Sequence, residues 1–576
     1  MLEPIDVQTL PPLLQRRHLP LAVVALLASG TFQVLASAPA SLWWLELIGW
    51  LPCLWVLTRL EGWRALLAGW LVGISANIAI FWWVIHTVKT FAFMPWPLAA
   101  LVLLGFSILW GGYLAAFGLG LRAVRRASGA LWPVAAALWF VACEYLNPQL
   151  FPYFQGVTWY EQSRIFLLSS LTGVSGVSFL IVLANAVLLM LWERRGEATP
   201  FAGPVLRNAA VLAGTVAVAV LWSSFQLHRV DVAAAKAPSA KMAIIQPNQS
   251  VDQIKRGSRK DKDWLLHDFL ALSQEVEDEQ PDVDVYVWPE GSFRGGPKNK
   301  RNHELVEFAE SVQAEVWTGT SVSMGSKANR TRHGAAYRID AEGRVDAPYL
   351  KTVLLPFGEF MPLADVFPIL RKIKGVGNFD PGDGARVFET PHGNMSYVIC
   401  YEAIRPRYVR QAMKAGADLL VNGTYEGWFG DTNCPHQHLM LAAVQSASHG
   451  VPMVRSATTG ISAFIDAAGR LERTTPVFER TTLVGEVAHY TVPTPYTALG
   501  DWFAWLALLG SFGLLYRGST RPQARWDRIA WAGLVLFVAV TPLAWLMIRT
   551  APALDWITWA VALLVVIAVP LRGWRR

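Results

Sequence analysis

The chain alternates long apolar runs with short polar loops at both ends, while its middle part mixes polar and apolar residues at shorter intervals. A run of about 20 apolar residues is long enough for a helix to cross the hydrocarbon core of a bilayer. The pattern therefore predicts a polytopic α-helical membrane protein with one large polar domain inserted. The candidate spans, seven before the middle part and three after it, are 20–38, 42–58, 65–85, 98–119, 130–146, 165–192, 209–226, 502–516, 529–548 and 554–571.

Composition and charge agree with a membrane protein. Hydrophobic residues make up 53% of the chain and charged residues only 16%, which is too apolar for a soluble protein of this size. Basic residues occur in alternate loops, for example Arg59 and Arg64 and then Arg122 and Arg125. Because Lys and Arg favour cytoplasmic loops, the polar domain is expected on the outer face. These orientation signals explain the net charge of +7, so no nucleic-acid partner is expected.

The spans divide the chain into three regions. We expect an N-terminal membrane domain of about seven spans at 1–227, a polar domain at 228–497 and a C-terminal membrane segment at 498–576. The basic, apolar N-terminus also fits a cleavable signal peptide that ends near Ala36-Ser37-Ala38. Cleavage there would leave the remaining topology unchanged.

The polar domain reads as alternating strands and helices, which indicates an α/β fold. Strands are predicted at 241–246, 284–288, 315–320, 335–340, 396–400, 418–422, 452–456 and 461–466. Helices are predicted at 260–277, 302–313, 404–416 and 436–449. Glu290 follows one predicted strand and Cys400 ends another, and functional groups in α/β sheets often lie at such strand ends.

Cys400 is the candidate nucleophile of an acyl transfer. A nucleophilic thiol needs a base or a nearby cation, and the start of a helix after Cys400 would favour its thiolate. Glu290 is the candidate base, and Lys351 the candidate cation that lowers the thiol pKa and binds an oxyanion. Taken alone, a Glu after Pro is usually a turn residue and a Lys is usually solvated. A disulfide between Cys400 and Cys434 is the alternative to a free thiol.

Two further carboxylates have supporting positions. Glu359, eight residues after Lys351, would orient the ammonium and keep it charged. Glu402, two residues after Cys400, would hold the turn of the nucleophile by hydrogen bonds. A metal is not expected, because His436 and His438 would point to different sides of a helix.

Three separated motifs carry a family resemblance, and it covers roughly residues 20–516. They resemble the Glu-Lys-Cys motifs of the nitrilase superfamily, and their place between membrane spans is similar to the apolipoprotein N-acyltransferase family. The motifs are Trp288-Pro289-Glu290, Lys351 with Leu355-Pro356-Phe357-Gly358-Glu359, and Ile399-Cys400-Tyr401-Glu402. The resemblance implies an αββα sandwich on the periplasmic side of a bacterial inner membrane.

The resemblance also implies a ping-pong reaction without metal or diffusible cofactor. Cys400 would take an acyl chain from a phospholipid, typically phosphatidylethanolamine, and pass it to the N-terminal amine of a diacylated apolipoprotein. Glu290 would be the general base and Lys351 the oxyanion stabiliser, with Glu359 and Glu402 as supporting carboxylates. Tyr401 would shape the pocket. The other residues expected at the pocket or its lid are Phe357, Tyr425, Trp428, Phe429 and His438.

The chain departs from the family in places that do not touch the proposed catalytic residues. The loop 422–430 differs from the usual family pattern, and the spans 529–548 and 554–571 are additions. Two alternatives therefore stay open: a divergent paralogue or membrane-tethered amidase that uses the same site, and a non-catalytic lipoprotein-binding protein. A basic loop after Glu290 is either solvated or a lid that touches anionic headgroups; it contains Arg294, Lys298, Lys300 and Arg301.

Overall fold

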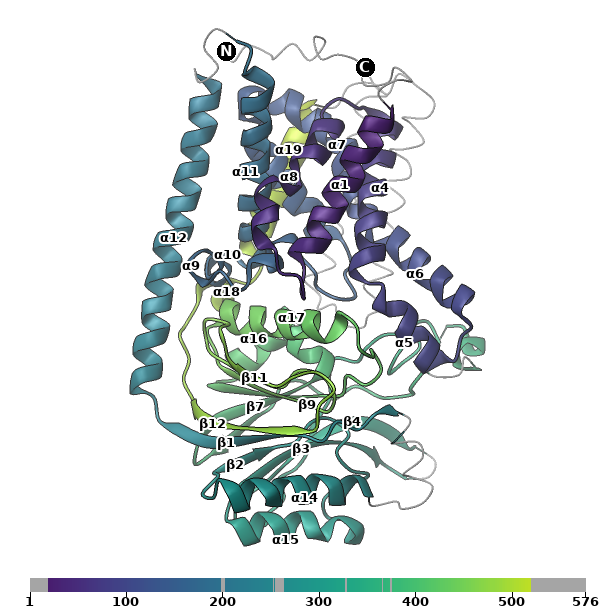
Figure 1. Ribbon diagram of the computed structural model, residues 1–576, viewed down its shortest axis with the longest axis vertical. Helices are drawn as coiled ribbons and strands as arrows, with labels where there is room; N and C mark the ends of the chain where they lie inside the picture. Colours follow the sequence, from purple (N-terminus) through teal and green to yellow (C-terminus); the bar gives the residue numbers. More distant parts are fainter. Residues whose placement is uncertain are drawn as a thin grey trace. The chain divides into compact units, whose positions relative to one another are not determined.

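The computed structural model divides the chain into two compact units (Figure 1). The helical unit holds the described residues up to Ile85, then Trp96–Ser223, and those from Asp501 onward. The sheet unit holds His86–Pro95 and Ser224–Gly500. The structure describes residues 19–197, 203–251, 253, 264–326, 329–364, 366–372 and 376–518. The predicted spans 529–548 and 554–571 and the possible signal-peptide start lie outside these residues.

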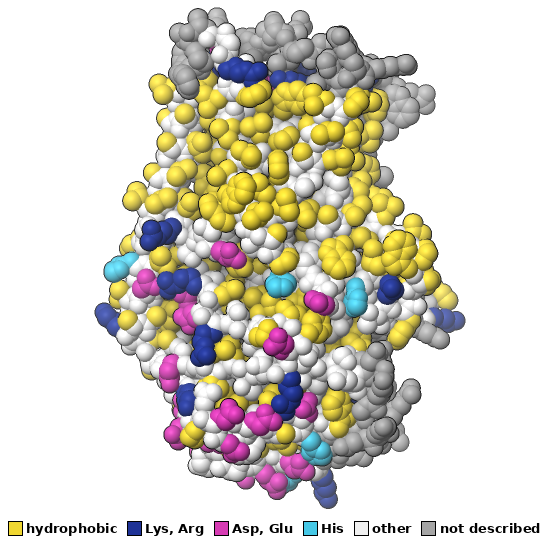
Figure 2. All heavy atoms as spheres, viewed as in Figure 1, with side chains coloured by type: hydrophobic (Ala, Val, Ile, Leu, Met, Phe, Trp, Pro, Cys, Tyr) yellow, Lys and Arg dark blue, Asp and Glu magenta, His cyan; other side chains and the backbone are white. Residues whose placement is uncertain are grey.

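Long apolar helices make up the helical unit. Five helical stretches in the described part of the chain are long and apolar enough to cross a membrane: Leu19–Ala36, Gly62–Ile80, Trp96–Leu146, Val174–Arg194 and Pro204–Lys236. Large apolar side chains such as Leu101, Leu206 and Leu221 point outward from them, and Figure 2 shows how densely hydrophobic side chains cover this part. The prediction of a multi-pass membrane protein is therefore confirmed.

Several predicted span boundaries are wrong. The predicted span 98–119 is two helices, α6 (Trp96–Trp110) and α7 (Gly112–Ser128), which meet at Gly111. The predicted span 165–192 begins inside the short helix α9 (Ser163–Phe166) and includes α10 (Ser169–Thr172) before α11 (Val174–Arg194). The stretch 86–97, between the predicted spans 65–85 and 98–119, is largely helical, because α5 spans Trp83–Ala92. An apolar run does not show where a helix breaks, so hydropathy alone merged these elements.

Glycine lets α4 approach the junction of α6 and α7 closely. A Cβ on Gly73 of α4 (Gly62–Ile80) would lie 2.4 Å from the carbonyl oxygen of Gly111, so only glycine permits this approach. Small residues commonly allow such close backbone packing between membrane helices. The other helices of the unit are α1 (Leu19–Ala36), α2 (Glu46–Gly49), α3 (Leu51–Leu57), α8 (Trp132–Leu146), α9 (Ser163–Phe166), α10 (Ser169–Thr172), the start of α12 (Pro204–Lys236) and α19 (Trp502–Gly518).

The sheet unit contains two six-stranded sheets between helices, so the predicted αββα sandwich is confirmed (Figure 1). The first sheet has the order β12-β1-β2-β3-β4-β5 and the second β11-β10-β9-β8-β7-β6. The first comprises β1 (Ser239–Gln246), β2 (Val285–Val287), β3 (Glu315–Met324), β4 (Thr331–Ile339), β5 (Tyr349–Leu350) and β12 (Thr481–Ala488). The second comprises β6 (Val387–Thr390), β7 (Gly393–Ile399), β8 (Leu419–Thr424), β9 (Met453–Ala457), β10 (Ala463–Ile465) and β11 (Leu471–Thr474).

Helices cover the outer face of each sheet. Figure 1 shows α14 (Trp264–Glu279) and α15 (His303–Val312) on the first sheet, and α16 (Pro406–Lys414) and α17 (Cys434–His449) on the second. Strands β1–β3 are parallel, as are β7–β9. The carboxyl ends of parallel strands meet at one edge of a sheet, and this brings the segments after β2 and β7 to the site.

The four strands that the sequence did not predict are the edge strands of the two sheets: β5, β6, β11 and β12. β5 has only two residues, and all but one residue of β11 are exposed, so neither carries a buried alternating pattern. β12 pairs antiparallel with β1 from Ser239↔Ala488 to Gln246↔Thr481. Its burial does not alternate regularly, which explains why periodicity did not reveal it.

Candidate active site

Cys400 sits at a sharp turn directly after β7. Its φ of 50° lies in the left-handed region, which a non-glycine residue adopts only at a cost. A 3₁₀ turn at Cys400–Ile404 follows the strand, and α16 (Pro406–Lys414) comes after it. The sequence predicted this helix at 404–416. Cys400 is half-buried and free, and Cys434 is also free, so the disulfide interpretation is wrong.

Glu290 follows β2, and closely packed neighbours hold its backbone. Trp288 is fully buried and stacks on Phe269 with ring centroids 5.0 Å apart. A Cβ on Gly319 of β3 would lie 2.8 Å from the Cα of Glu290, so glycine lets the two backbones approach. Sequence analysis missed Gly319, because only the pairing of β2 with β3 shows the need for it.

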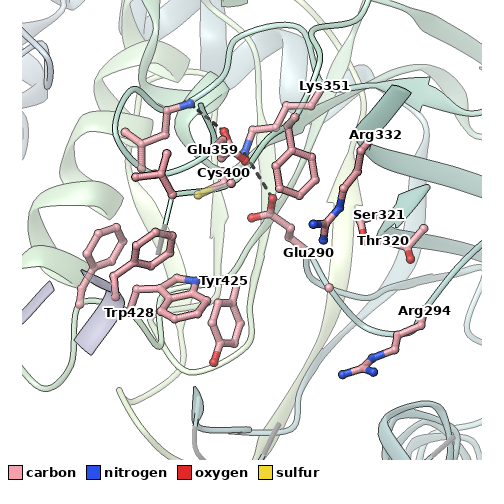
Figure 3. Close-up of a pocket in the computed structure, with 18 of the residues that line it drawn as sticks. Glu290, Arg294, Thr320, Ser321, Arg332, Lys351, Glu359, Cys400, Tyr425 and Trp428 are labelled. Atoms are coloured by element: carbon pink, nitrogen blue, oxygen red, sulfur yellow. Dashed lines mark hydrogen bonds and ion pairs between the residues drawn. The ribbon is translucent and has the colours of Figure 1, made fainter. Parts of the chain in front are cut away.

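Lys351 follows β5 and lies between two carboxylates. Its Nζ is 2.6 Å from Glu359 Oε1 and 3.3 Å from Glu290 Oε1. The lysine side chain is 1% exposed, while the two carboxylates are 18% and 21% exposed and open onto the pocket. We call these three residues the Lys351 cluster. Figure 3 shows the cluster beside the sulfur of Cys400.

The pKa values in the cluster follow from burial and from the surplus of negative charge. Burial raises the pKa of the Glu290 carboxyl, although Lys351 opposes the shift. Burial would lower the pKa of Lys351, but Glu290 and Glu359 hold it well above its usual range. Burial and the Glu290 charge raise the pKa of Cys400 to about 12, with Lys351 again opposing.

The resting thiol is therefore protonated, contrary to the expectation that Lys351 and the following helix would favour a thiolate. Lys351 already faces two carboxylates, so it does not offset the burial of a third negative group. A hydrogen bond from the Cys400 side chain stabilises the Glu290 carboxylate, so the candidate base and the candidate nucleophile lie together. Moving the proton from sulfur to Glu290 leaves the total charge of the site unchanged, which favours a transfer coupled to nucleophilic attack.

Glu402 joins the lysine segment to the cysteine segment. Its fully buried Oε1 accepts hydrogen bonds from the Thr352 and Val353 backbone N–H groups, at 2.7 and 2.9 Å. Its Oε2 accepts one from the Ile399 N–H at 2.8 Å. These donors come directly after Lys351 and directly before Cys400, so one carboxylate fixes both strand ends. Burial raises the pKa of Glu402 to about 7.

Glu402 and Tyr401 also have aromatic and basic neighbours. The Tyr349 hydroxyl donates to Glu402 Oε1 at 2.6 Å and also contacts the Tyr408 hydroxyl. Tyr401 is buried at the turn, and its hydroxyl accepts a hydrogen bond from Arg405 Nη1 at 3.1 Å. Tyr401 is therefore packed within the protein, and it is not among the residues that line the pocket.

A pocket of about 590 Å³ opens onto the cluster. Its lining includes Glu290, Lys351, Glu359 and Cys400. Aromatic side chains also line it: Phe91, Phe93, Phe293, Phe379, Tyr425, Trp428 and Phe429. Trp428 packs edge-on against Phe91 and Tyr425, with centroids 4.7 and 5.7 Å apart. The predicted pocket residues Tyr425, Trp428 and Phe429 thus lie where the sequence placed them.

Two predicted pocket residues do not line the pocket. Phe357 is 51% exposed on the turn between Lys351 and Glu359, whose geometry directs it to the surface. His438 is buried behind the site, with its Nδ1 2.7 Å from Glu426 Oε1. Arg455 Nη2 donates to the same oxygen at 2.7 Å, and its Nη1 donates to Asn422 Oδ1 at 2.5 Å. We call Arg455, Glu426, His438 and Asn422 the Arg455 cluster.

A double sheet that presents a carboxylate, a lysine and a cysteine at its strand ends is the arrangement of carbon–nitrogen hydrolases. The family model for the carbon-nitrogen hydrolase domain matches residues 241–496, and this chain joins that domain to membrane helices. The model for the apolipoprotein N-acyltransferase N-terminal domain matches residues 29–187. The chain belongs to the apolipoprotein N-acyltransferase family and is an acyltransferase.

Relatives agree along most of the chain. The protein named apolipoprotein N-acyltransferase from Geobacter metallireducens is 29% identical, over 81% of this chain and 89% of its own. Its namesake from Bdellovibrio bacteriovorus is 28% identical, over 80% and 86%. The one from Pseudomonas syringae pv. tomato is 29% identical, over 84% and 95%. The similarity thus spans both units.

Proposed function

We propose that the protein transfers a fatty acyl chain from a phospholipid to the N-terminal amine of a diacylglyceryl-cysteine lipoprotein, through a thioester on Cys400. The observation that carries the proposal is the convergence of Glu290, Lys351 and Cys400 in one aromatic-lined pocket. The family membership supports lipoprotein N-acylation as the reaction. Phosphatidylethanolamine is the proposed donor.

In the first half-reaction the Cys400 sulfur attacks the ester carbonyl carbon of the phospholipid. The thiol proton passes to Glu290 as the carbon–sulfur bond forms, because a thiol with a pKa of about 12 supplies almost no thiolate at neutral pH. The carbon–oxygen bond then breaks, and Glu290 returns the proton to the leaving alkoxide. The products are a lysophospholipid and an uncharged acyl thioester.

Lys351 stabilises the oxyanion of the tetrahedral intermediate in this mechanism. Its ammonium is buried and already charged, so it needs no reorganisation when the negative charge develops on the carbonyl oxygen. Glu359, 2.6 Å from Nζ, fixes the direction of the lysine side chain. The backbone N–H of Leu355 donates to the other Glu359 oxygen at 2.7 Å and holds that carboxylate in turn.

In the second half-reaction the neutral α-amine of the lipoprotein attacks the thioester carbon. Glu290 takes a proton from the amine nitrogen as the carbon–nitrogen bond forms. The carbon–sulfur bond breaks, and the departing thiolate receives the proton from Glu290. The enzyme returns to its resting state, and the lipoprotein gains an amide-linked third chain.

The proposed setting is the inner membrane of a bacterium. Arginines in alternate loops, such as Arg59, Arg64 and Arg122, favour the cytoplasm for those loops. The catalytic region at 228–497 would then lie on the periplasmic side, between the membrane regions 1–227 and 498–576.

A two-stage mass measurement tests the function. The detergent-purified protein is incubated with phosphatidylethanolamine, freed of lipid, and then mixed with a diacylated lipopeptide. We expect a mass increase of one acyl chain in the first stage, and its transfer to the lipopeptide amine in the second.

Other acceptors give different results in the second stage. Discharge to water would support the amidase alternative, and discharge only to another amine would support the paralogue. Absence of any adduct, with lipopeptide binding unchanged in Cys400→Ser, would support a non-catalytic lipoprotein-binding protein. The Cys400→Ser variant is the matched control in every arm.

A further inference from the structure

Two arginines line the pocket that holds the Lys351 cluster. Arg294 lies in the loop after Glu290, and Arg332 lies at the start of β4. Figure 3 shows both guanidinium groups on the side of Glu290 away from Trp428 and Tyr425 in that view. The pocket therefore has an aromatic part and a basic part.

Arg332 is held in place by an aromatic ring and by its backbone. Its guanidinium carbon lies 4.4 Å from the centroid of the Phe379 ring, within the range of a cation–π contact. Its backbone N–H donates to Asp380 Oδ2 at 3.0 Å, and its carbonyl accepts from the Asp380 N–H at 2.7 Å. The Phe379 N–H in turn donates to the Glu359 carbonyl at 3.0 Å. The arginine is thus tied to the segment that orients Lys351.

Among the described residues, neither guanidinium has a carboxylate partner. In the part of the chain that the structure describes, no Asp or Glu oxygen lies within 4.0 Å of Arg294 or Arg332. Arg338, six residues along the same strand, differs: it pairs with Glu315 at 2.5 Å and with Asp346 at 3.1 Å. The N–H groups of Arg332 are therefore oriented by stacking and remain available to a ligand.

The ionisable side chains of the pocket favour an anion. Three basic side chains and two acidic ones line it, and the protonated Cys400 adds no charge. Lys351 lies between Glu290 and Glu359, so the positive surplus lies on the two arginines. A planar guanidinium binds two oxygens of a phosphate at once, which makes a phosphodiester a suitable ligand.

We propose that Arg332, assisted by Arg294, binds the phosphodiester of the acyl donor and thereby selects phospholipids over uncharged acyl glycerols. The inference rests on the proposed function and names a recognition element for its donor. Glycerol separates the phosphate from the reacting ester by only a few bonds, so one molecule reaches both parts of the pocket. The aromatic part would receive the acyl chain. The two arginines would recognise the phosphate and not the headgroup alcohol attached to it.

The test compares Arg332→Gln with Arg330→Gln. Arg330 is an exposed arginine two residues away that does not line the pocket, so both variants lose one positive charge from the same segment. Formation of the Cys400 thioester is measured in nonionic micelles with phosphatidylethanolamine, phosphatidylglycerol or a diacylglycerol of the same chains.

We expect Arg332→Gln to lower kcat/KM for both phospholipids by about ten- to a hundredfold, the usual effect of losing a charged hydrogen-bonded contact. The diacylglycerol rate should not change, and Arg330→Gln should behave like the wild type with all donors. Arg332→Lys keeps the charge but loses the planar guanidinium that binds two oxygens at once. Its kcat/KM for phospholipids should therefore lie between those of the wild type and Arg332→Gln.

Three results would overturn the inference. They are equal phospholipid rates in Arg332→Gln and Arg330→Gln, an equal loss with diacylglycerol and phospholipid, and a wild type that uses diacylglycerol as well as phospholipid. The thermal midpoint of Arg332→Gln should match that of Arg330→Gln, which excludes misfolding. A wild type that forms no thioester with any donor would instead refute the proposed function.

Discussion

Two clusters in the sheet unit each pair a buried cation with one or more carboxylates. They differ in how far those carboxylates are exposed. In the Arg455 cluster both Arg455 and Glu426 are fully buried. In the Lys351 cluster the lysine is buried, but Glu290 and Glu359 remain about one-fifth exposed at the pocket. The first cluster is closed to any substrate, whereas the second keeps a carboxylate available to one.

The pKa values of the two glutamates differ in the same sense. Burial raises the pKa of Glu290, and one lysine shared with Glu359 does not reverse the shift. Burial also acts on Glu426, but Arg455 and His438 together lower the pKa of Glu426 below its usual value. A base must exchange protons near neutral pH, while a structural ion pair must not. The comparison therefore assigns chemistry to the Lys351 cluster and support to the Arg455 cluster.

The largest effect is expected when the Lys351 cluster loses its cation. Lys351→Met should lower the rate of thioester formation by at least about a thousandfold, because the oxyanion loses its charged partner and two carboxylates lose theirs. Intact-mass kinetics with phosphatidylethanolamine measures this rate. Lys414→Met, which changes an exposed lysine of the same unit, should leave it unchanged. Activity of Lys351→Met within tenfold of the wild type would remove the assigned role.

The next effect concerns stability and the Arg455 cluster. Glu426→Gln leaves the buried Arg455 charge uncompensated, which should destabilise the sheet unit by about 3–5 kcal/mol. The exposed Glu389→Gln is the control, and thermal unfolding in detergent is the measurement. The lowered pKa of Glu426 means that its ionised form stabilises the fold above the usual carboxyl pKa, and this contribution is lost as the pH falls. The two variants should therefore converge in acid, and equal midpoints at neutral pH would contradict the assignment.

The smallest effect is a shift in pH dependence. Glu359 raises the pKa of both Glu290 and Cys400, so Glu359→Gln should lower both. Glu290 must be ionised to accept the thiol proton, so the acid limb of the rate profile should move to lower pH. The pH profile of thioester formation tests this, again with Glu389→Gln as control. An acid limb that moves to higher pH would show that Glu359 does not act through charge.

Local sequence pointed to the groups proposed to react because each lies in a short motif at a strand end. Glu290, Lys351 and Cys400 needed no knowledge of distant contacts. The α/β character followed from the alternating elements, and the αββα arrangement followed from the family resemblance. The Arg455 cluster joins β8, the following loop, α17 and β9, so its partners become visible only in the folded unit. Hydropathy located the membrane regions but not the helix break at Gly111.

The protonation state of the Cys400 thiol could not be predicted from the sequence either. Lys351 and the start of the helix after Cys400 suggested an activated thiolate, but the thiol pKa depends on burial and on how many carboxylates share one lysine. The basic part of the pocket combines Arg294 and Arg332 from separate segments, and only the first belonged to a loop that the sequence marked as basic.

The most direct test of the account is the intact mass of the wild type and Cys400→Ser after incubation with a phosphatidylethanolamine whose two acyl chains differ in mass. The account predicts one added chain on the wild type, removed by neutral hydroxylamine as expected for a thioester, and none on Cys400→Ser. Its mass identifies the ester that reacts. Acylation of a lipopeptide by Cys400→Ser at the wild-type rate, without any enzyme adduct, would contradict it.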